Sequence, residues 1–70
     1  MSTEEAREAL AAWLNEHKQT RAGLGRLLGV SGPAVSMWLS GHSVPSPWLR
    51  GKLEEITGIP SGSWESRRER

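Results

Sequence analysis

The middle of this 70-residue chain gathers basic side chains and contains no acidic one. Residues 17–52 carry a formal charge of +5, against −3 for residues 1–16 and −1 for residues 53–70, which together make the net +1 of the chain. The basic residues of the middle are Lys18, Arg21, Arg26, Arg50 and Lys52. This segregation of charge favours a polyanionic partner. A chance distribution of solvated charges is the alternative, and charge alone leaves it open.

No catalytic or metal-binding set of side chains accompanies this charge. A nucleophile, a general base and an orienting acid do not occur together, glycine motifs that bind phosphate are absent, and so small a core leaves no deep pocket. The chain has no cysteine, and we expect its two distant histidines, His17 and His42, to face solvent rather than bind metal. We therefore expect a binding protein rather than an enzyme, with neither a cofactor nor a metal.

The size of the chain indicates one domain, close to the smallest that folds without a covalent or metal staple. Since there is no cysteine for a disulfide, apolar packing must stabilise it, and four tryptophans offer large areas to bury. No apolar stretch approaches the roughly 20 residues that cross a bilayer. The acidic, polar start of the chain is unlike a secretory signal. We expect a cytoplasmic protein that does not contact membranes.

Start and stop signals predict two helices in the first half. Ser2, with Glu5 three residues later, predicts a capping box, and the polar residues 15–19 end the first helix. The apolar face of this helix consists of Ala6, Leu10, Trp13 and Leu14. Thr20 is the expected cap of a second, short helix that ends at Gly29. The apolar side of the second helix consists of Leu24, Leu27 and Leu28.

The second half predicts two further helices and a final turn. Ser31 caps a third helix that ends at Gly41, and Pro33 suits its first turn because proline lacks an N–H there. Ser46 followed by proline repeats the start signal for a fourth helix, which Gly58 ends. The apolar residues of the fourth helix are Leu49, Leu53 and Ile56. A turn at residues 59–61 leads to a short segment with Trp64. No stretch alternates apolar and polar residues, so we expect an all-α domain over residues 1–66, followed by a charged tail, residues 67–70, that frays.

Residues 20–41 are the stretch that points most directly to a function. Their pattern predicts two short helices joined by a tight turn. Gly25 is small enough for the second helix of the pair to cross closely, and Gly29 tolerates the positive φ of the turn. Apolar residues lie where these helices meet the core, at Leu24, Leu28, Val30, Val35 and Trp38. This is the layout of a helix-turn-helix, whose second helix lies in a major groove of DNA.

The same positions carry a family resemblance. They are Thr20-Arg21, Leu24-Gly25, Leu28-Gly29-Val30-Ser31, Val35-Ser36, Trp38, Gly41 and Pro45, followed by the stretch from Lys52 to Pro60 and by Trp64. The chain resembles the Cro/repressor-type (XRE-like) helix-turn-helix family over nearly its whole length. The resemblance implies a compact four- to five-helix bundle of the lambda-repressor-like type. Trp38, Pro45 and Thr57-Gly58 are also similar to a small antitoxin-like branch of this fold.

The resemblance also implies roles for individual residues on the DNA. The helix from Ser31 to Ser40 would be the recognition helix, and Arg21 would bind a backbone phosphate. Base-reading positions would be Gly32, Pro33, Ser36 and Met37, and the loop residues His42 and Ser43 would approach phosphates. Arg26, Ser31 and Ser40 complete the candidate DNA-binding set.

Two departures from the family pattern affect the reading of bases. Gly32 and Pro33 stand where many members carry Gln, Arg or Lys, and neither can make a bidentate contact, which contributes roughly 1–3 kcal/mol of discrimination. Ser31, Ser36 and Met37 remain, with hydroxyl groups and an apolar contact suited to a thymine methyl group. Sequence specificity would then depend on the close approach of the helix backbone to the DNA and on DNA deformability. Alternatively, the affinity of this chain for DNA is modest, and a partner supplies the remaining affinity.

Each candidate also has a purely structural interpretation. Arg21 and Arg26 would be solvated charges on the helix surface. Ser36 and Met37 would be ordinary surface residues. Trp38 is expected in the core rather than as a stacking platform. Leu39 is unusual because Val35 and Trp38 already fill the core side of its helix. Leu39 and Trp48 either cover each other or mark a dimer contact, and an exposed pair would favour the dimer.

Two functions of different classes follow. The first is a sequence-specific DNA-binding transcriptional regulator of the phage or prokaryotic type, a repressor that binds a palindromic operator as a homodimer, including one that forms only on DNA. The alternative is an antitoxin or adaptor that holds a protein partner on the same helical scaffold. The reduced base-reading set and the surplus of tryptophan favour this alternative.

Overall fold

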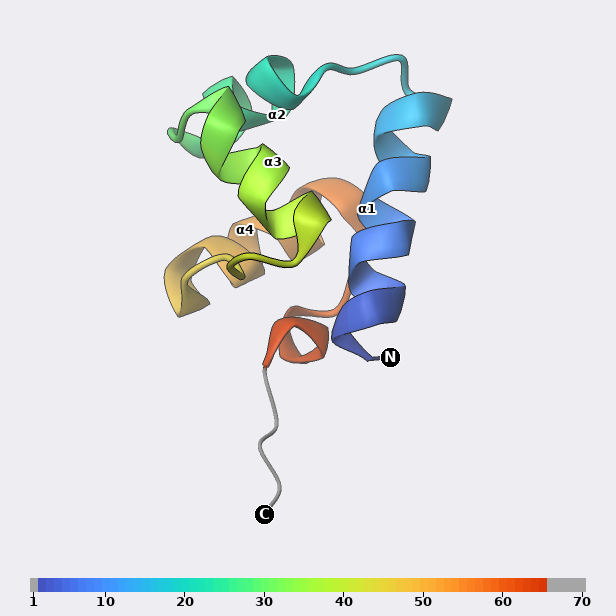
Figure 1. The fold of residues 1–70 in the computed structure, drawn as a ribbon, viewed down its shortest axis with the longest axis vertical. Coiled ribbons are helices and arrows are strands. Elements are labelled where there is room, and N and C mark those ends of the chain that lie inside the picture. Colours follow the sequence, from blue (N-terminus) through green and yellow to red (C-terminus); the bar gives the residue numbers. More distant parts are fainter. Residues whose placement is uncertain (1, 66–70) are drawn as a thin grey trace.

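The computed structural model describes residues 2–65 and contains α-helices but no strand within that range (Figure 1). The elements are α1 (Thr3–Glu16), α2 (Arg21–Leu28), α3 (Gly32–Ser40), α4 (Pro47–Thr57) and the 3-10 turn η1 (Ser61–Trp64). The expectation of an all-α domain is therefore confirmed for this range. The described chain has four α-helices, because the closing segment with Trp64 makes one 3-10 turn instead of a fifth helix. The predicted tail, residues 67–70, and residue 66 lie outside the described residues.

Hydroxyl caps begin the first three helices where the sequence predicts them. The capping box of α1 is complete, because Glu5 N–H donates to Ser2 Oγ at 3.1 Å and Ser2 N–H donates to Glu5 Oε1 at 2.8 Å. Thr20 Oγ1 accepts from the backbone of α2 at 2.9 Å, and Ser31 Oγ accepts from that of α3 at 3.3 Å. The fourth start is right in position, but Ser46 makes no side-chain cap bond.

The helix ends also follow the predicted signals. The caps Gly29, Gly41 and Gly58 all adopt the left-handed conformation. At Gly29, where φ is 79°, this conformation turns the chain from α2 into α3 within three residues. The first helix ends differently, since Lys18, a non-glycine residue, has a φ of 53°.

One apolar core joins all the elements. Its buried residues are Ala6, Leu10, Leu14, Leu24, Leu28, Val35, Trp38, Leu53, Ile59 and Trp64. The prediction for Leu27 is wrong, because this side chain is 53% exposed. The buried sector of α2 is formed by Leu24, Gly25 and Leu28, and position 27 lies about 100° around the helix from position 28. Trp13, Leu49 and Ile56 are only half-buried at the edge of the core.

The close crossing of α2 and α3 depends on Gly25. A Cβ at this position would lie 2.6 Å from the Val30 carbonyl oxygen and 3.0 Å from the Ser31 carbonyl carbon. The Val30 N–H also donates to the Gly25 carbonyl at 2.8 Å, which closes the turn between the two helices. The prediction of a small residue here is confirmed.

The closing turn η1 packs on the first turn of α1 (Figure 1). The Thr3 hydroxyl donates to the Ser63 carbonyl at 3.1 Å, and Trp64 is fully buried. The beginning and the end of the described chain are thereby held together at one end of the molecule.

Substitution at two glycines tests the crossing. We expect Gly25→Ala to lower the free energy of unfolding by about 1–3 kcal/mol, because backbone atoms must move to admit the methyl group. Gly51→Ala is the matched control within α4, where a Cβ meets nothing within 4 Å, and should raise stability by up to about 1 kcal/mol. Chemical denaturation measures both. A harmless Gly25→Ala would contradict the close approach.

Candidate nucleic-acid interface

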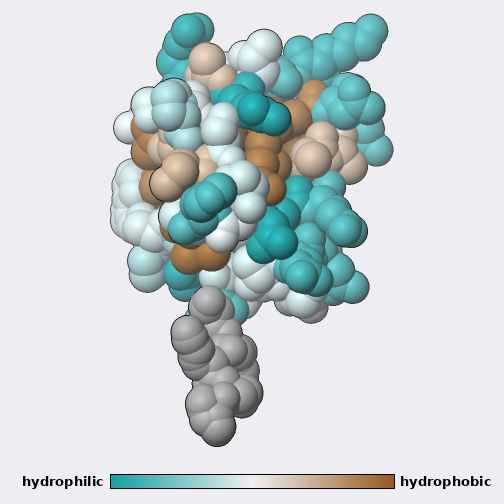
Figure 2. Space-filling model, viewed as in Figure 1, coloured by the Kyte–Doolittle hydropathy of each residue, from teal (hydrophilic) through white to brown (hydrophobic). Residues whose placement is uncertain are grey.

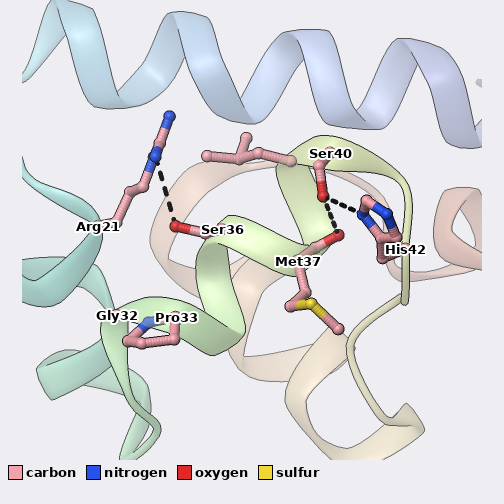
Figure 3. Close-up of a pocket in the computed structure, with 8 residues that line it drawn as sticks. Arg21, Gly32, Pro33, Ser36, Met37, Ser40 and His42 are labelled. Atoms are coloured by element: carbon pink, nitrogen blue, oxygen red, sulfur yellow. Dashed lines mark hydrogen bonds between the residues drawn. The ribbon is translucent and has the colours of Figure 1, made fainter.

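The outer face of α3 borders a shallow hollow of about 720 Å³ (Figure 3). Residues from the start of α2, from α3 and from the turn after α3 line it. They are Arg21, Gly32, Pro33, Ser36, Met37, Leu39, Ser40 and His42. Seven of these eight are residues that the sequence singled out for DNA binding, so the fold brings most of the predicted set to one surface.

Arg21 reaches across from α2 to α3. Its Nη1 donates to Ser36 Oγ at 3.4 Å, a long bond between an exposed guanidinium and a half-buried hydroxyl (Figure 3). A guanidinium has five N–H donors in a planar fork, and this bond uses one of them. Arg21 is thus aimed over α3 and keeps donors for an anionic ligand.

The last turn of α3 is organised around the Met37 carbonyl. This oxygen accepts from Gly41 N–H at 3.1 Å, from His42 N–H at 3.0 Å and from the Ser40 hydroxyl at 3.2 Å. Ser40 Oγ also lies 2.7 Å from His42 Nδ1. The two side chains therefore hold each other beside the hollow, as Figure 3 shows.

Gly32 has a packing role in addition to its place on the surface. A Cβ here would lie 3.3 Å from the backbone of Ala22, so a larger residue would push α3 away from α2. By the family resemblance, Gly32 stands at a base-reading position where many members carry a long polar side chain. The structure gives a physical reason for glycine here, since the position is half-buried against α2.

Three members of the predicted set do not line the hollow. Ser31 is the cap of α3, and its hydroxyl is engaged with Ala34 N–H. Ser43 is half-buried, and its N–H donates to the Met37 carbonyl at 3.3 Å. Arg26 is exposed in the last turn of α2, away from Arg21 around the helix.

Leu39 is a site residue that the sequence flagged but did not assign to the interface. It is half-buried and lines the hollow on α3 as well as two adjoining hollows toward α1. Figure 2 shows apolar surface between α3 and α1 with hydrophilic side chains around it. The signal was present in the sequence, because a third large apolar residue on α3 has no room in a core already filled by Val35 and Trp38.

Leu39 does not cover Trp48. Trp48 is 69% exposed, and the Lys52 ammonium lies 5.2 Å from the centroid of its ring. Of the two possibilities left open for this pair, mutual covering is therefore wrong. Trp38 is 4% exposed, as expected for a core residue.

Charge is distributed unevenly around the hollow. Its lining includes Arg21 and His42 and no acidic residue. The adjoining hollow toward α1 is lined by Glu4 and Glu8 and also by Arg7 and Arg21, and Arg21 is shared with the hollow over α3. An anion over α3 therefore meets no carboxylate, whereas in the hollow toward α1 two carboxylates offset the two guanidinium groups. Electrostatics thus favours an anionic ligand that follows α3.

Other kinds of site are not evident within residues 2–65. No group of three or more His, Asp or Glu side chains there could hold a metal ion, and no helix in that range has the length and apolar character to cross a membrane. His17 stacks on Trp13 with 4.4 Å between ring centroids, and its Nδ1 lies 3.0 Å from the Trp13 carbonyl.

Comparisons with known protein families, with curated proteins and with solved structures found no match.

Two serine caps test how α3 is held in place. Ser31→Ala removes the cap bond of α3 and should lower the free energy of unfolding by about 1 kcal/mol. Ser46→Ala is the matched control, because Ser46 occupies the same position before α4 without a cap bond, and should have a much smaller effect. Thermal denaturation followed by circular dichroism compares the two. Equal losses would show that the Ser31 bond does not stabilise α3.

Proposed function

We propose that this protein is a sequence-specific DNA-binding transcriptional regulator, in which α2 and α3 act as a helix-turn-helix of the lambda-repressor-like type. In this proposal α3 enters the major groove of double-stranded DNA. The observation that carries the proposal is the exposed face of α3, bordered by Arg21 and His42 and free of acidic residues in its lining. A repressor is the role that the resemblance to the Cro/repressor-type family favours.

Arg21 and His42 would position the domain on the DNA backbone. Their side chains flank α3, one over Ser36 and the other beside Ser40. Contacts with phosphate fix the register and orientation of a domain without reading sequence. The bond between Arg21 and Ser36 supports this role, since it pre-orders a long side chain that would otherwise lose rotamer freedom on binding.

Base reading would depend on Ser36 and Met37. The Ser36 hydroxyl can donate to or accept from a base edge, and Met37, which is 45% exposed, suits a thymine methyl group. Gly32 also lines the hollow and has no side chain, so the backbone of α3 could approach the groove closely there. With few polar side chains to read bases, DNA shape and deformability would contribute much of the specificity. A two-fold dimer on a palindromic operator would read half-sites about 34 Å apart.

The alternative function is a protein-binding module of the antitoxin or adaptor type. The apolar part of the same surface, with Pro33, Met37 and Leu39, favours it. Apolar side chains at a surface hollow are typical of contacts with protein. Co-purification with a toxin-like protein encoded in the neighbouring reading frame would support this function over the first.

Selection of bound sites from random double-stranded DNA tests the proposal directly, and the enriched site then serves in gel-shift titrations at several salt concentrations. We expect Arg21→Ala to weaken binding roughly 10-fold on all sequences and to reduce the salt slope by about 1, since one phosphate contact is lost. Arg26→Ala is the matched control, because it removes an equal charge from outside the hollow.

Ser36→Ala completes the titrations. It should relax sequence preference at one position while leaving the salt slope unchanged. If no site is enriched, or if Arg21→Ala and Ser36→Ala bind as the native chain does, α3 is not the DNA-binding surface.

A further inference from the structure

A groove runs between α1 and α3, on the side of α3 that faces α1. It consists of two adjoining hollows of about 520 Å³ and 390 Å³, whose linings share Ala11, Arg21 and Leu39. On α1 the lining extends from Glu4 to Asn15, a length of roughly 16 Å or three helical turns. Arg21 is the one lining residue that the proposed contacts with DNA also use, so most of this groove has no part in that function.

The floor of the groove is apolar. Ala11 is exposed on α1, and its single methyl group leaves a depression beside longer side chains. Leu39, which is half-buried on α3, lines the same groove, and Leu14 lines its far end. Figure 2 shows the resulting apolar surface between the two helices, with hydrophilic side chains around it. An apolar strip with a polar rim is typical of a surface that binds another protein.

Arg7 stacks on the end of α3 at the rim of the groove. A Cβ at Gly41 would lie 3.3 Å from Arg7 Cζ, 3.5 Å from Nη1 and 3.6 Å from Nε. Because the central carbon is the nearest of the three atoms, the guanidinium lies with its flat face over Gly41. Its N–H groups point outward in the plane of the guanidinium, so this stacking does not use them. Arg7 is half-buried and lines the groove, and it can therefore donate to a ligand there from an ordered position.

The charges of the rim have both signs. Glu4 and Glu8 line one end together with Arg7, and Arg21 lies at the middle, where the two hollows meet. Both carboxylates are exposed. A nucleic acid carries only negative charge along its backbone and gains little from such a rim. A protein segment can carry a cation for the carboxylates and an anion for the guanidinium groups, so charge complementarity favours a protein ligand.

We propose that this groove binds an amphipathic α-helix of a second protein. In this arrangement an apolar side chain of the partner helix covers Ala11 and Leu39. A lysine or arginine near the N-terminus of that helix lies beside Glu8, and a carboxylate further along lies beside Arg21. A helix suits the space between two helices, because ridges of side chains three and four residues apart fit into such a groove. The positive end of its dipole favours placing its N-terminus at the acidic end of the groove.

This interaction goes beyond the proposed function, because the partner helix contacts α1 and the side of α3 that faces α1. DNA would contact the outer face of α3, and the alternative function also places its partner on that outer face. Binding of a helix to the groove is measured without DNA. Its failure would therefore leave the proposed DNA binding untouched, and a failure of DNA binding would leave the groove untouched.

Selection from a phage-displayed library tests the groove with the full chain. The library consists of helix-forming peptides of about 14 residues, randomised on one face. We expect enriched peptides with apolar residues three and four apart, a basic residue toward the N-terminus and an acidic residue further along. Their Kd should lie between about 10 and 100 μM, because the groove is short. If no peptide binds more tightly than about 1 mM, the proposal is wrong.

Ala11→Gln and Ala12→Gln form a matched pair that locates the bound peptide. Both alanines are exposed on α1, and Ala12 lines neither hollow of the groove. Glutamine is a good helix former, so both chains should keep the circular dichroism of the native chain. Ala11→Gln fills the floor of the groove and should raise the peptide Kd at least 10-fold, whereas Ala12→Gln should leave it unchanged. Equal effects would place the peptide elsewhere and overturn the proposal.

Exchange of charge tests the direction of the bound helix. Glu8→Lys should weaken binding of the selected peptide about 5-fold, and a peptide whose basic residue is replaced by glutamate should regain the lost affinity. Glu16→Lys is the control, since Glu16 is exposed on the same helix outside the groove. An equal loss with Glu16→Lys, or no recovery with the reversed peptide, would contradict binding in this groove. Sedimentation equilibrium of the chain alone distinguishes a second copy as the occupant: self-association that Ala11→Gln removes would overturn the assignment of the groove to another protein.

Discussion

The close approach of α2 to the start of α3 is the constraint on which the rest of this domain depends. Two contacts define it: the backbone of Gly25 against Val30, and the backbone of Gly32 against Ala22. With these fixed, Arg21 lies one residue before the second contact and Ser36 one helical turn after it, so the guanidinium reaches the hydroxyl. The position of the exposed face of α3 therefore depends on Gly25 and Gly32, where a side chain would hold the two helices apart.

Much of the fold was predictable because its signals are local. A hydroxyl cap or a left-handed glycine acts within a few residues, so the starts and ends of α1, α2 and α3 follow from sequence alone. The failures are different in kind. Leu27 is as apolar as Leu28, and the packing of α2 against the other elements decides which of them is buried. The closing segment, by contrast, was predicted as a final turn, and it makes a 3-10 turn that packs against α1 and α4.

The candidate site was predictable as a set of residues but not as a surface. Spacing along α3 placed Ser36, Met37 and Ser40 on its exposed side, yet neither the Arg21 bond to Ser36 nor the contact of Ser40 with His42 follows from spacing. The carboxylates of α1 beside this surface were also unforeseen. The net charge of a segment does not reveal which distant helix will lie next to it. The contact of Gly32 with Ala22 could not be predicted for the same reason, so the sequence indicated only that Gly32 lacks a side chain for reading bases.

The burial of Trp64 beside α1 has a consequence for the order of events during synthesis. Trp64 is fully buried, and its turn is tied to Thr3 at the other end of the described chain. A nascent chain that has made only α1, α2 and α3 must leave in water the part of α1 on which η1 packs. Contacts so far apart in sequence form late because they close a long loop. Of the described elements, α1 is thus made before the others but is among the last to be fully covered, because its packing is completed only after η1 has left the ribosome.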